Sequence, residues 1–408
     1  MWVPTFIKNP MPAPTTTPFR RRPSVDFSVT GLVFIGMMMF MGLAAVNSQA
    51  NLLFGVFGLM IGVLLISTGI SRVVLRKLEV RRVIPEHAVV GERTVLTYEC
   101  KNVKRFWPSL SVTIGELDGS EAFTRQPLAY MLHAAPGMTA VVPTEVIPKR
   151  RGIHTLNRFQ VGTSFPFGFI KRAIERRHRE TILIYPAIGR VSPALLNQCR
   201  SAETSGAMLR PRRGGQDEFY GIKEFRNGEN PRLIHWKRSA RTGVLISKEM
   251  TLVSPPRLLL LVDTHLLNRT RREHALVEKT LAMAGSLATH TLEAGLMVGL
   301  CAWSGDWIAI PPNRGKRHRH DLMTALARLP VNLELGSEEL MKQARAHLKS
   351  GTTAVLLSPR VTQPTLAEQS RGSLIVISPS SEASNGWFEF DGGVDFSKAM
   401  PVEQQPPT

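Results

Sequence analysis

The sequence predicts a membrane-anchored α+β protein with three parts. These are a two-helix transmembrane hairpin, a small β-sandwich and an α/β domain with a mostly parallel sheet. Residues 27–71 contain no charged side chain. Short runs of alternating apolar and polar residues follow, up to about residue 186. Beyond residue 257, apolar strand patterns alternate with helical ones, which is typical of an α/β sheet.

Charge and cysteine content narrow the classes of function. The 408 residues include 51 Lys and Arg against 32 Asp and Glu, a formal net charge of +19. Such an excess favours an anionic neighbour, namely nucleic acid, an acidic protein or anionic lipid. Cys100, Cys199 and Cys301 lie far apart, so neither a disulfide framework nor a zinc site is expected. The common phosphate-loop, dinucleotide and hydrolase motifs are absent, and no cofactor is expected.

The hairpin at residues 27–71 consists of two apolar segments, 27–46 and 52–70, separated by a polar turn. Each is long enough to cross about 30 Å of hydrocarbon. Basic residues precede the first segment and follow the second, and they are Arg20, Arg21, Arg22, Arg72, Arg76, Lys77, Arg81 and Arg82. The positive-inside rule therefore places both ends in the cytoplasm, with residues 1–26 as a cytoplasmic tail. A cleavable signal peptide ending near Ala50 is the alternative.

The β-sandwich is expected over residues 77–186, with strands at 94–100, 110–114, 140–147 and 181–184. The aromatic turn at residues 165–169 is expected to plug one end of its core. Five basic side chains follow this turn and are expected to form a solvated face that meets anionic headgroups; they are Lys171, Arg172, Arg176, Arg177 and Arg179.

The α/β domain is expected over residues 257–378, with strands at 257–263, 296–302, 353–357 and 373–378 and helices at 271–294, 321–329 and 337–348. Residues 379–408 form a polar tail that is expected to be disordered. Active sites in such sheets lie at the carboxyl ends of strands, which makes Asp263 a candidate. Binding of local backbone N–H groups is the other interpretation of this carboxylate.

The linker at residues 187–256 contains a distinctive segment, 215–249, that combines glycine, aromatic and charged residues. Its characteristic residues are Glu218, Phe219, Glu224, Arg226, Gly228, Arg232, His235, Trp236, Lys237 and Arg241. In order and spacing this segment resembles the bacterial family called domain of unknown function 58. The resemblance extends upstream to the paired apolar segments and the turn at residues 165–169. It therefore covers most of the chain.

The resemblance implies a C-terminal domain similar to a von Willebrand factor type A domain. It implies partnership with an AAA+ ATPase of the MoxR type, and possibly with a transglutaminase-like membrane protein, and it implies no enzymatic activity. It places the chain in the bacterial inner membrane as a multi-pass protein with cytoplasmic soluble domains. Type A domains often hold a metal through Asp-x-Ser-x-Ser, of which only Asp263 is present here. Asp263 is thus a degenerate metal-site position, because too few oxygen ligands remain for Mg²⁺.

Three functions compete at this point. The favoured one is a membrane-anchored interaction or scaffold protein that works with the ATPase in envelope-related assembly. The alternatives are an enzyme using Asp263, His235 or His265, and nucleic-acid binding through the basic surface, for which no motif is present. Segment 215–249 is expected to form a structural clasp, that is, to hold the β-sandwich and the α/β domain together at their junction. Trp236 is then expected in a core, and the charged side chains of the segment are expected to pair with one another. A docking surface is the other interpretation.

The topology predicts the accessibility of introduced cysteines. A membrane-impermeant thiol reagent should label Ser48→Cys in intact cells, because the turn between the spans faces outward. Ser24→Cys and Ser380→Cys should react only after the membrane is permeabilised. Labelling of the latter two in intact cells would show that the assigned orientation is wrong.

Overall fold

The computed structural model describes residues 24–399 apart from 207–212, 227–229, 252–255, 349–351, 362–373 and 393. The chain forms two compact units, Met1–Tyr185 and Pro186–Thr408. The boundary between them lies one residue before the predicted end of the sandwich.

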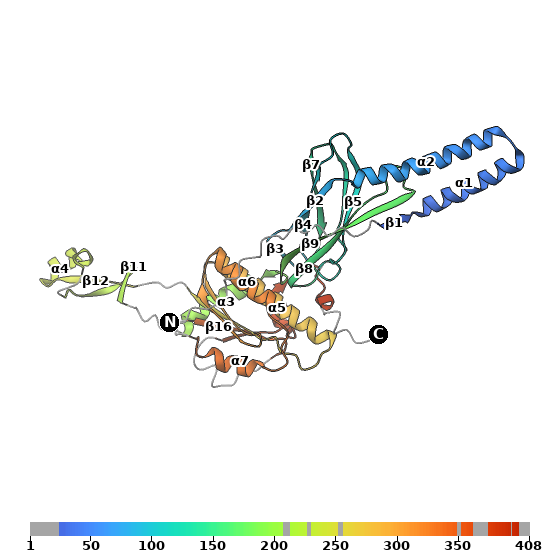
Figure 1. Cartoon of the computed structure of the whole chain (residues 1–408). Helices are drawn as coiled ribbons and strands as arrows, with labels where there is room; N and C mark the ends of the chain where they lie inside the picture. The colour runs from blue at the N-terminus through green and yellow to red at the C-terminus, as the bar shows by residue number, and fades with distance from the viewer. Residues whose placement is uncertain are drawn as a thin grey trace. The chain divides into compact units, whose positions relative to one another are not determined.

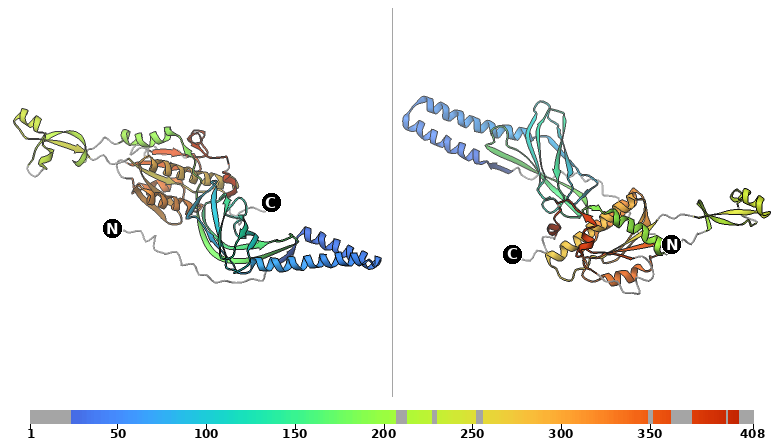
Figure 2. Two further views of the ribbon diagram at one scale, coloured as in Figure 1. Left: turned by 90° about the horizontal axis from the view of Figure 1, so that it is seen from above. Right: turned by 180° about the vertical axis from the view of Figure 1, so that it is seen from behind.

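The first unit begins with two long apolar helices, α1 (Val29–Ser48) and α2 (Asn51–Leu75). They run side by side as a hairpin (Figures 1 and 2), and Gln49 makes the turn in the left-handed conformation at φ 54°. By length and composition, both helices could cross a membrane. A Cβ added to Gly42 would lie 2.9 Å from the Phe57 ring, so the glycine permits the helices to approach closely there.

Two antiparallel sheets follow the hairpin. The smaller has the order β2 (Leu78–Val83), β4 (Thr94–Asn102) and β7 (Thr139–Val146). The larger has the order β1 (Ser24–Phe27), β9 (Ile170–Tyr185), β8 (Gly152–Thr163), β5 (Ser109–Glu116) and β6 (Leu128–Ala134), with β3 (His87–Val89) beside β9 in parallel. The two sheets share one core, to which Tyr98 and Val142 contribute from the smaller sheet and Ile114 and Phe159 from the larger.

Two of these strands differ from the sequence-based expectation. Residues 24–26 were assigned to the tail and Phe27 to the first apolar segment, but residues 24–27 form β1 and pair with β9 through Val25 and Arg172. β9 itself is 16 residues long, whereas only residues 181–184 were predicted as strand. The charged run within β9 hid the strand, because half-buried and exposed side chains alternate from Arg176 to Thr181 while all of them are polar or charged.

The carboxyl end of α2 enters the sandwich. Val74 and Leu75 belong to the shared core. The buried ammonium of Lys104 donates to the carbonyl oxygens of Val74 (2.8 Å) and Arg76 (3.3 Å), and Ser109 Oγ also donates to Val74 O at 2.9 Å. These donors satisfy carbonyl groups that have no partner inside the helix. Burial lowers the pKa of Lys104 to about 8.

The start of α1 is attached to the aromatic turn. Ser28 N donates to Phe169 O at 3.0 Å, and the Phe34 and Phe169 rings stack with centroids 4.3 Å apart. A Cβ at Gly31 would overlap the Phe169 carbonyl. The expectation that residues 165–169 only plug the sandwich core is therefore wrong in part. Phe165 packs against the core, but Phe169 contacts the first apolar helix and Phe167 is exposed.

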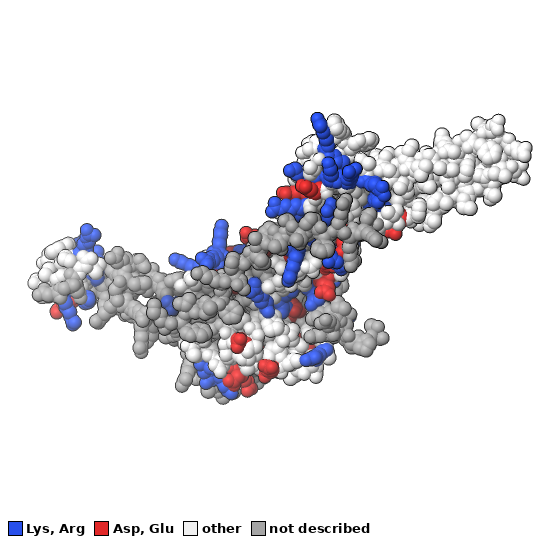
Figure 3. Space-filling view, in the orientation of Figure 1, with Lys and Arg blue, Asp and Glu red and all other residues white. Residues whose placement is uncertain are grey.

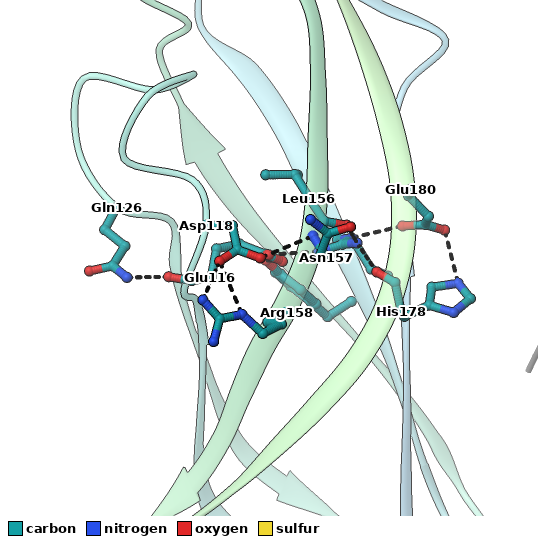
Figure 4. Close-up of polar contacts among 10 residues, drawn as sticks. Glu116, Asp118, Gln126, Leu156, Asn157, Arg158, His178 and Glu180 are labelled. Carbon is teal, nitrogen blue, oxygen red and sulfur yellow. Dashed lines mark hydrogen bonds and ion pairs between the residues drawn. The ribbon is translucent and has the colours of Figure 1, made fainter. Parts of the chain in front are cut away.

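A cluster of charged residues lies inside the sandwich (Figure 4). Arg82 was counted among the cations that flank the membrane, but it is 1% exposed. Its guanidinium donates to Glu116 Oε2 at 2.6 Å and Glu180 Oε2 at 2.7 Å, and to the carbonyl oxygens of Leu156 and His178. Tyr98 donates to the other Glu116 oxygen at 2.7 Å. Burial and the Glu116 charge raise the pKa of Tyr98, so its hydroxyl stays protonated.

The second unit is built on a five-stranded sheet with the order β15 (Trp307–Asn313), β14 (Met297–Trp303), β13 (Arg257–Val262), β16 (Thr352–Leu357) and β17 (Leu374–Ile377). All neighbours are parallel except β15, an antiparallel edge strand that was not predicted.

Helices cover both faces of this sheet (Figure 1). α5 (Arg271–Glu293) and α6 (Lys316–Arg328) pack together on one face, and α7 (Ser337–Ala344) covers the other. On the α7 face, Leu340 and Met341 pack against Leu259 and Leu356 of the strands.

Parts of the predicted linker and tail are ordered. The linker contains β10 (Arg190–Val191) and α3 (Pro193–Gly206). The tail contains α9 (Glu382–Asn385), β18 (Phe388–Glu389), which pairs with β10, and η2 (Phe396–Ala399). The expectation that the chain is disordered after residue 379 is therefore wrong for the described residues up to 399. Residues 400–408 lie outside the described part. Aromatic packing explains the order, since Phe390 stacks with Phe388 and contacts Phe396 edge-on.

The buried cluster predicts a large effect of one substitution. Glu116→Ala should lower the free energy of unfolding by about 3–5 kcal/mol, because it leaves the Arg82 guanidinium without its fully buried counter-ion. Chemical denaturation of the detergent-solubilised protein measures this. Glu79→Ala, which removes an exposed carboxylate from the same strand as Arg82, is the control and should have little effect. Equal stability of the two variants would refute the importance of the pair.

Candidate functional site

Four elements around segment 215–249 form what we call the signature module. They are β11 (Arg213–Glu224), η1 (Pro231–Leu233), α4 (Trp236–Thr242) and β12 (Ile246–Thr251). β11 and β12 pair antiparallel, with Ile222 opposite Lys248 and Glu224 opposite Ile246. η1 begins at Pro231, and the Asn230 side chain caps it.

Local capping explains why this sequence folds into a turn and a short helix. The His235 ring caps α4 by accepting from Arg238 N at 3.3 Å, and Gly243 ends the helix at φ 74°. Ser239 ties α4 to β12, because its hydroxyl accepts from Ile246 N at 2.9 Å and donates to His235 O at 3.2 Å. Ile234 is buried beside it. His235 therefore has a structural role, and Ser239 is a positioning residue that was not singled out from the sequence.

The module exposes an apolar surface next to cations. Trp236 is 66% exposed, and Val244 and Leu245, which follow the end of α4, are also exposed. Six exposed cations share the described stretch 221–226 and 230–248 with one exposed carboxylate, Glu224; the cations are Arg226, Arg232, Lys237, Arg238, Arg241 and Lys248.

One expectation for the signature residues is wrong, and another stays a prediction. Trp236 is not a core residue, because Ile234 and Ser239 already fill the contact with β12. Within the described part of the chain, Arg232, Lys237 and Arg241 form no ion pair. Two of the carboxylates expected to pair with them, those of Glu218 and Glu229, lie outside what is described, so the charge clasp stays a prediction. The side chains of Glu218 and Phe219 lie outside what is described, as does Gly228.

The second candidate lies where β13 ends. Asp263 is buried, and its two oxygens accept from His265 N and from Ser358 Oγ, each at 2.9 Å. Ser358 follows the neighbouring parallel strand β16. The first of these bonds is the short loop that aspartate side chains often make with the backbone two residues ahead. Burial raises the pKa of Asp263, and the two hydrogen bonds oppose that shift.

This strand-end arrangement holds a loop in place. Thr264 O accepts from Asn332 N at 3.0 Å, and Leu266 N donates to Asn332 O at 2.8 Å. Asp263 and Ser358 bind each other, and both are nearly inaccessible to solvent. His265, which was also considered for catalysis, contributes its backbone N–H to this loop. Among the described residues, no group of three or more His, Cys, Asp or Glu side chains is arranged to hold a metal ion.

Part of this region matches a known protein family. Residues 221–368 match the family model described as "Protein of unknown function DUF58". A DUF58 domain occupies that stretch. It covers the signature module from Gly221 onward and the α/β sheet through β16, so the exposed Trp236 and the buried Asp263 belong to the same domain. No curated protein matches the chain.

The residues that follow Asp263 predict that divalent cations do not stabilise the protein. Added Mg²⁺ or Mn²⁺ should leave the melting temperature unchanged, because His265 and Leu267 stand where the pattern has the serine hydroxyls that such ions require. Differential scanning fluorimetry with and without the metal measures this. Asp263→Ala serves as the matched variant. A metal-dependent rise in melting temperature that disappears in Asp263→Ala would establish a metal site instead.

Proposed function

We propose that this protein is a membrane-anchored interaction protein whose signature module docks a soluble partner. The observation that carries the proposal is the exposed indole of Trp236, in a module that also exposes Val244, Leu245 and six cations. Tryptophan and arginine are the side chains most enriched at energetically dominant positions of protein interfaces. Figure 3 shows blue side chains on the visible face of the module.

The electrostatics of the module indicate the class of partner. Among its described side chains, exposed cations outnumber exposed carboxylates, so an acidic protein surface fits best. The resemblance suggests an AAA+ ATPase of the MoxR type as this partner, with a transglutaminase-like membrane protein as a second one, in envelope-related assembly. We place the protein in the bacterial inner membrane with its soluble units in the cytoplasm. The cations around the two apolar helices support that orientation.

The sheet of the second unit supports a further part of this proposal. Its three parallel strand pairs and its helices on both faces are consistent with a von Willebrand factor type A-like domain. Asp263 then occupies the position of the degenerate metal site. In this interpretation the domain binds partners without a metal bridge.

The two other functions have less support. An enzyme using Asp263 would need a substrate to reach a carboxyl group whose oxygens already accept two hydrogen bonds beneath the surface. Nucleic-acid binding would use the same cations of the module, but among the module's described side chains Trp236 is the single exposed aromatic ring, which offers little for base stacking.

The docking proposal is tested by Trp236→Ala. Affinity for the purified MoxR-type ATPase, measured by biolayer interferometry in detergent, should fall by about 30-fold, which corresponds to the 2 kcal/mol of a dominant interface residue. The melting temperature should not change, because the ring is in solvent. Arg241→Glu should weaken binding in the same direction.

Trp107→Ala is the matched control, because that indole in the first unit is 59% exposed and lies outside the module. It should bind like wild type. If Trp236→Ala and Trp107→Ala bind the ATPase equally well, the module is not the docking site. If Trp236→Ala melts several degrees lower, the ring has a structural role.

A further inference from the structure

A buried arginine lies where the apolar hairpin meets the sandwich. Arg172 is 8% exposed and occupies the third position of β9, opposite Thr163 of β8 and Val25 of β1. Its side chain alternates with that of the exposed Lys171 and lies on the same face of the strand as the buried Ile170. This position differs from the expectation that Arg172 belongs to a solvated basic face.

Within the described part of the chain, Arg172 has no hydrogen-bond acceptor and no carboxylate partner. Burial and the nearby charge of Arg72 both lower the pKa of Arg172, and no anion offsets them. At 8% exposure, a small part of Arg172 still reaches the surface. A buried cation without a counter-charge costs several kcal/mol, which makes an external anion the natural complement.

Arg72 places this site at the end of a membrane span. It is exposed and lies in the last turn of α2, which packs against β8 and β9. Arg76 and Lys77, also exposed, continue the basic group just beyond the helix. Figure 3 shows blue side chains gathered on the sandwich next to the hairpin, which is white along most of its length.

Exposed aromatic side chains mark the same end of the sandwich. Phe106 and Trp107 lie in the loop between β4 and β5, and Lys104 of that loop binds the carboxyl end of α2. Phe167 lies in the turn that holds the start of α1. Aromatic rings of this kind are enriched at the depth of lipid headgroups. The Arg172 site is therefore at the level where phospholipid phosphates lie.

We propose that Arg172 and Arg72 form a binding site for the phosphate of an anionic membrane phospholipid. The planar guanidinium can donate two parallel hydrogen bonds to two phosphate oxygens, which a lysine cannot do. Arg72, Arg76 and Lys77 add positive charge, so a lipid with net negative charge is preferred over a zwitterionic one. The site holds the lipid at the joint between hairpin and sandwich.

The proposal predicts that replacing Arg172 affects the melting temperature differently in the absence and in the presence of lipid. Arg172→Met should melt at the same or a higher temperature than wild type when the full chain is delipidated in a neutral detergent, because it removes an uncompensated buried charge. Added phosphatidylglycerol should raise the melting temperature of wild type and leave that of Arg172→Met unchanged. A purely structural arginine would instead make Arg172→Met less stable in both conditions, which would overturn the proposal.

Native mass spectrometry of the same samples measures lipid retention. Arg172→Met should bind phosphatidylglycerol at least about tenfold more weakly than wild type, as expected for the loss of charge-assisted hydrogen bonds. Arg72→Gln, at an exposed position where folding should not be at risk, should weaken binding in the same direction. Arg179→Met is the matched control, because it removes an exposed arginine of the same strand, and it should retain lipid like wild type.

Two further ligands separate the possible sources of phosphate. Phosphatidylcholine should bind more weakly than phosphatidylglycerol, and inorganic phosphate should not reproduce the stabilisation. If inorganic phosphate stabilises wild type as well as the lipid does, the site is for a soluble anion and the lipid assignment is wrong. If Arg172→Met and Arg179→Met retain equal amounts of lipid, Arg172 is not the binding residue.

Discussion

The structure of the first unit depends on how the apolar hairpin joins the sandwich. α2 continues into the core through Val74 and Leu75, and Lys104 and Ser109 bind the carbonyl groups at its end. α1 is fixed through Ser28 and Phe169. The end of α2 would otherwise leave carbonyl groups unsatisfied, so the loop that contains Lys104 has to lie against it. The hairpin also positions two edge strands, because β1 ends just before α1 and β2 begins just after α2.

Two arginines of the same sandwich show how a buried charge can be accommodated. Arg82 has carboxylates and carbonyls at hydrogen-bond distance on several sides, and the protein itself neutralises it. Arg172 has cations nearby and no acceptor among the described residues. The first arrangement is complete within the chain. The second lacks an acceptor among the described residues, and the proposed phospholipid phosphate would supply one.

The sequence predicted the features that depend on local pattern. The apolar hairpin, the strands around Tyr98 and Val142 and the alternating elements of the second unit were all indicated by periodicity or length. The predictions that proved wrong concerned residues whose partners lie far away in the sequence. Arg82 was assigned to the membrane flank because its partners Glu116 and Glu180 are 34 and 98 residues away. Composition indicates that charges are present, but it does not indicate which of them are buried together.

The candidate site was predicted unevenly for the same reason. His235 was expected to be a signature residue or, in the alternative, a catalytic one, but its ring caps α4. Trp236 was expected in a core, because large aromatic side chains are usually buried, yet Ser239 and Ile234 had taken that contact. Asp263 was located at the end of its strand. Its hydrogen bond with Ser358, 95 residues later, could not be inferred before the neighbouring strands were known.

The attachment of α1 to the sheet also limits how this protein can be divided or recombined. Residues 24–27 pair with β9, residue 28 caps α1, and Gly31 touches the backbone of Phe169. The connection between β1 and α1 is therefore held at each of these residues. Inserting one residue there would rotate the whole helix by about 100° relative to the sandwich. The sandwich would therefore fix the rotation, about its own axis, of any unrelated membrane helix fused after Phe27. A recombinant protein that keeps the sandwich should accordingly keep the hairpin as well.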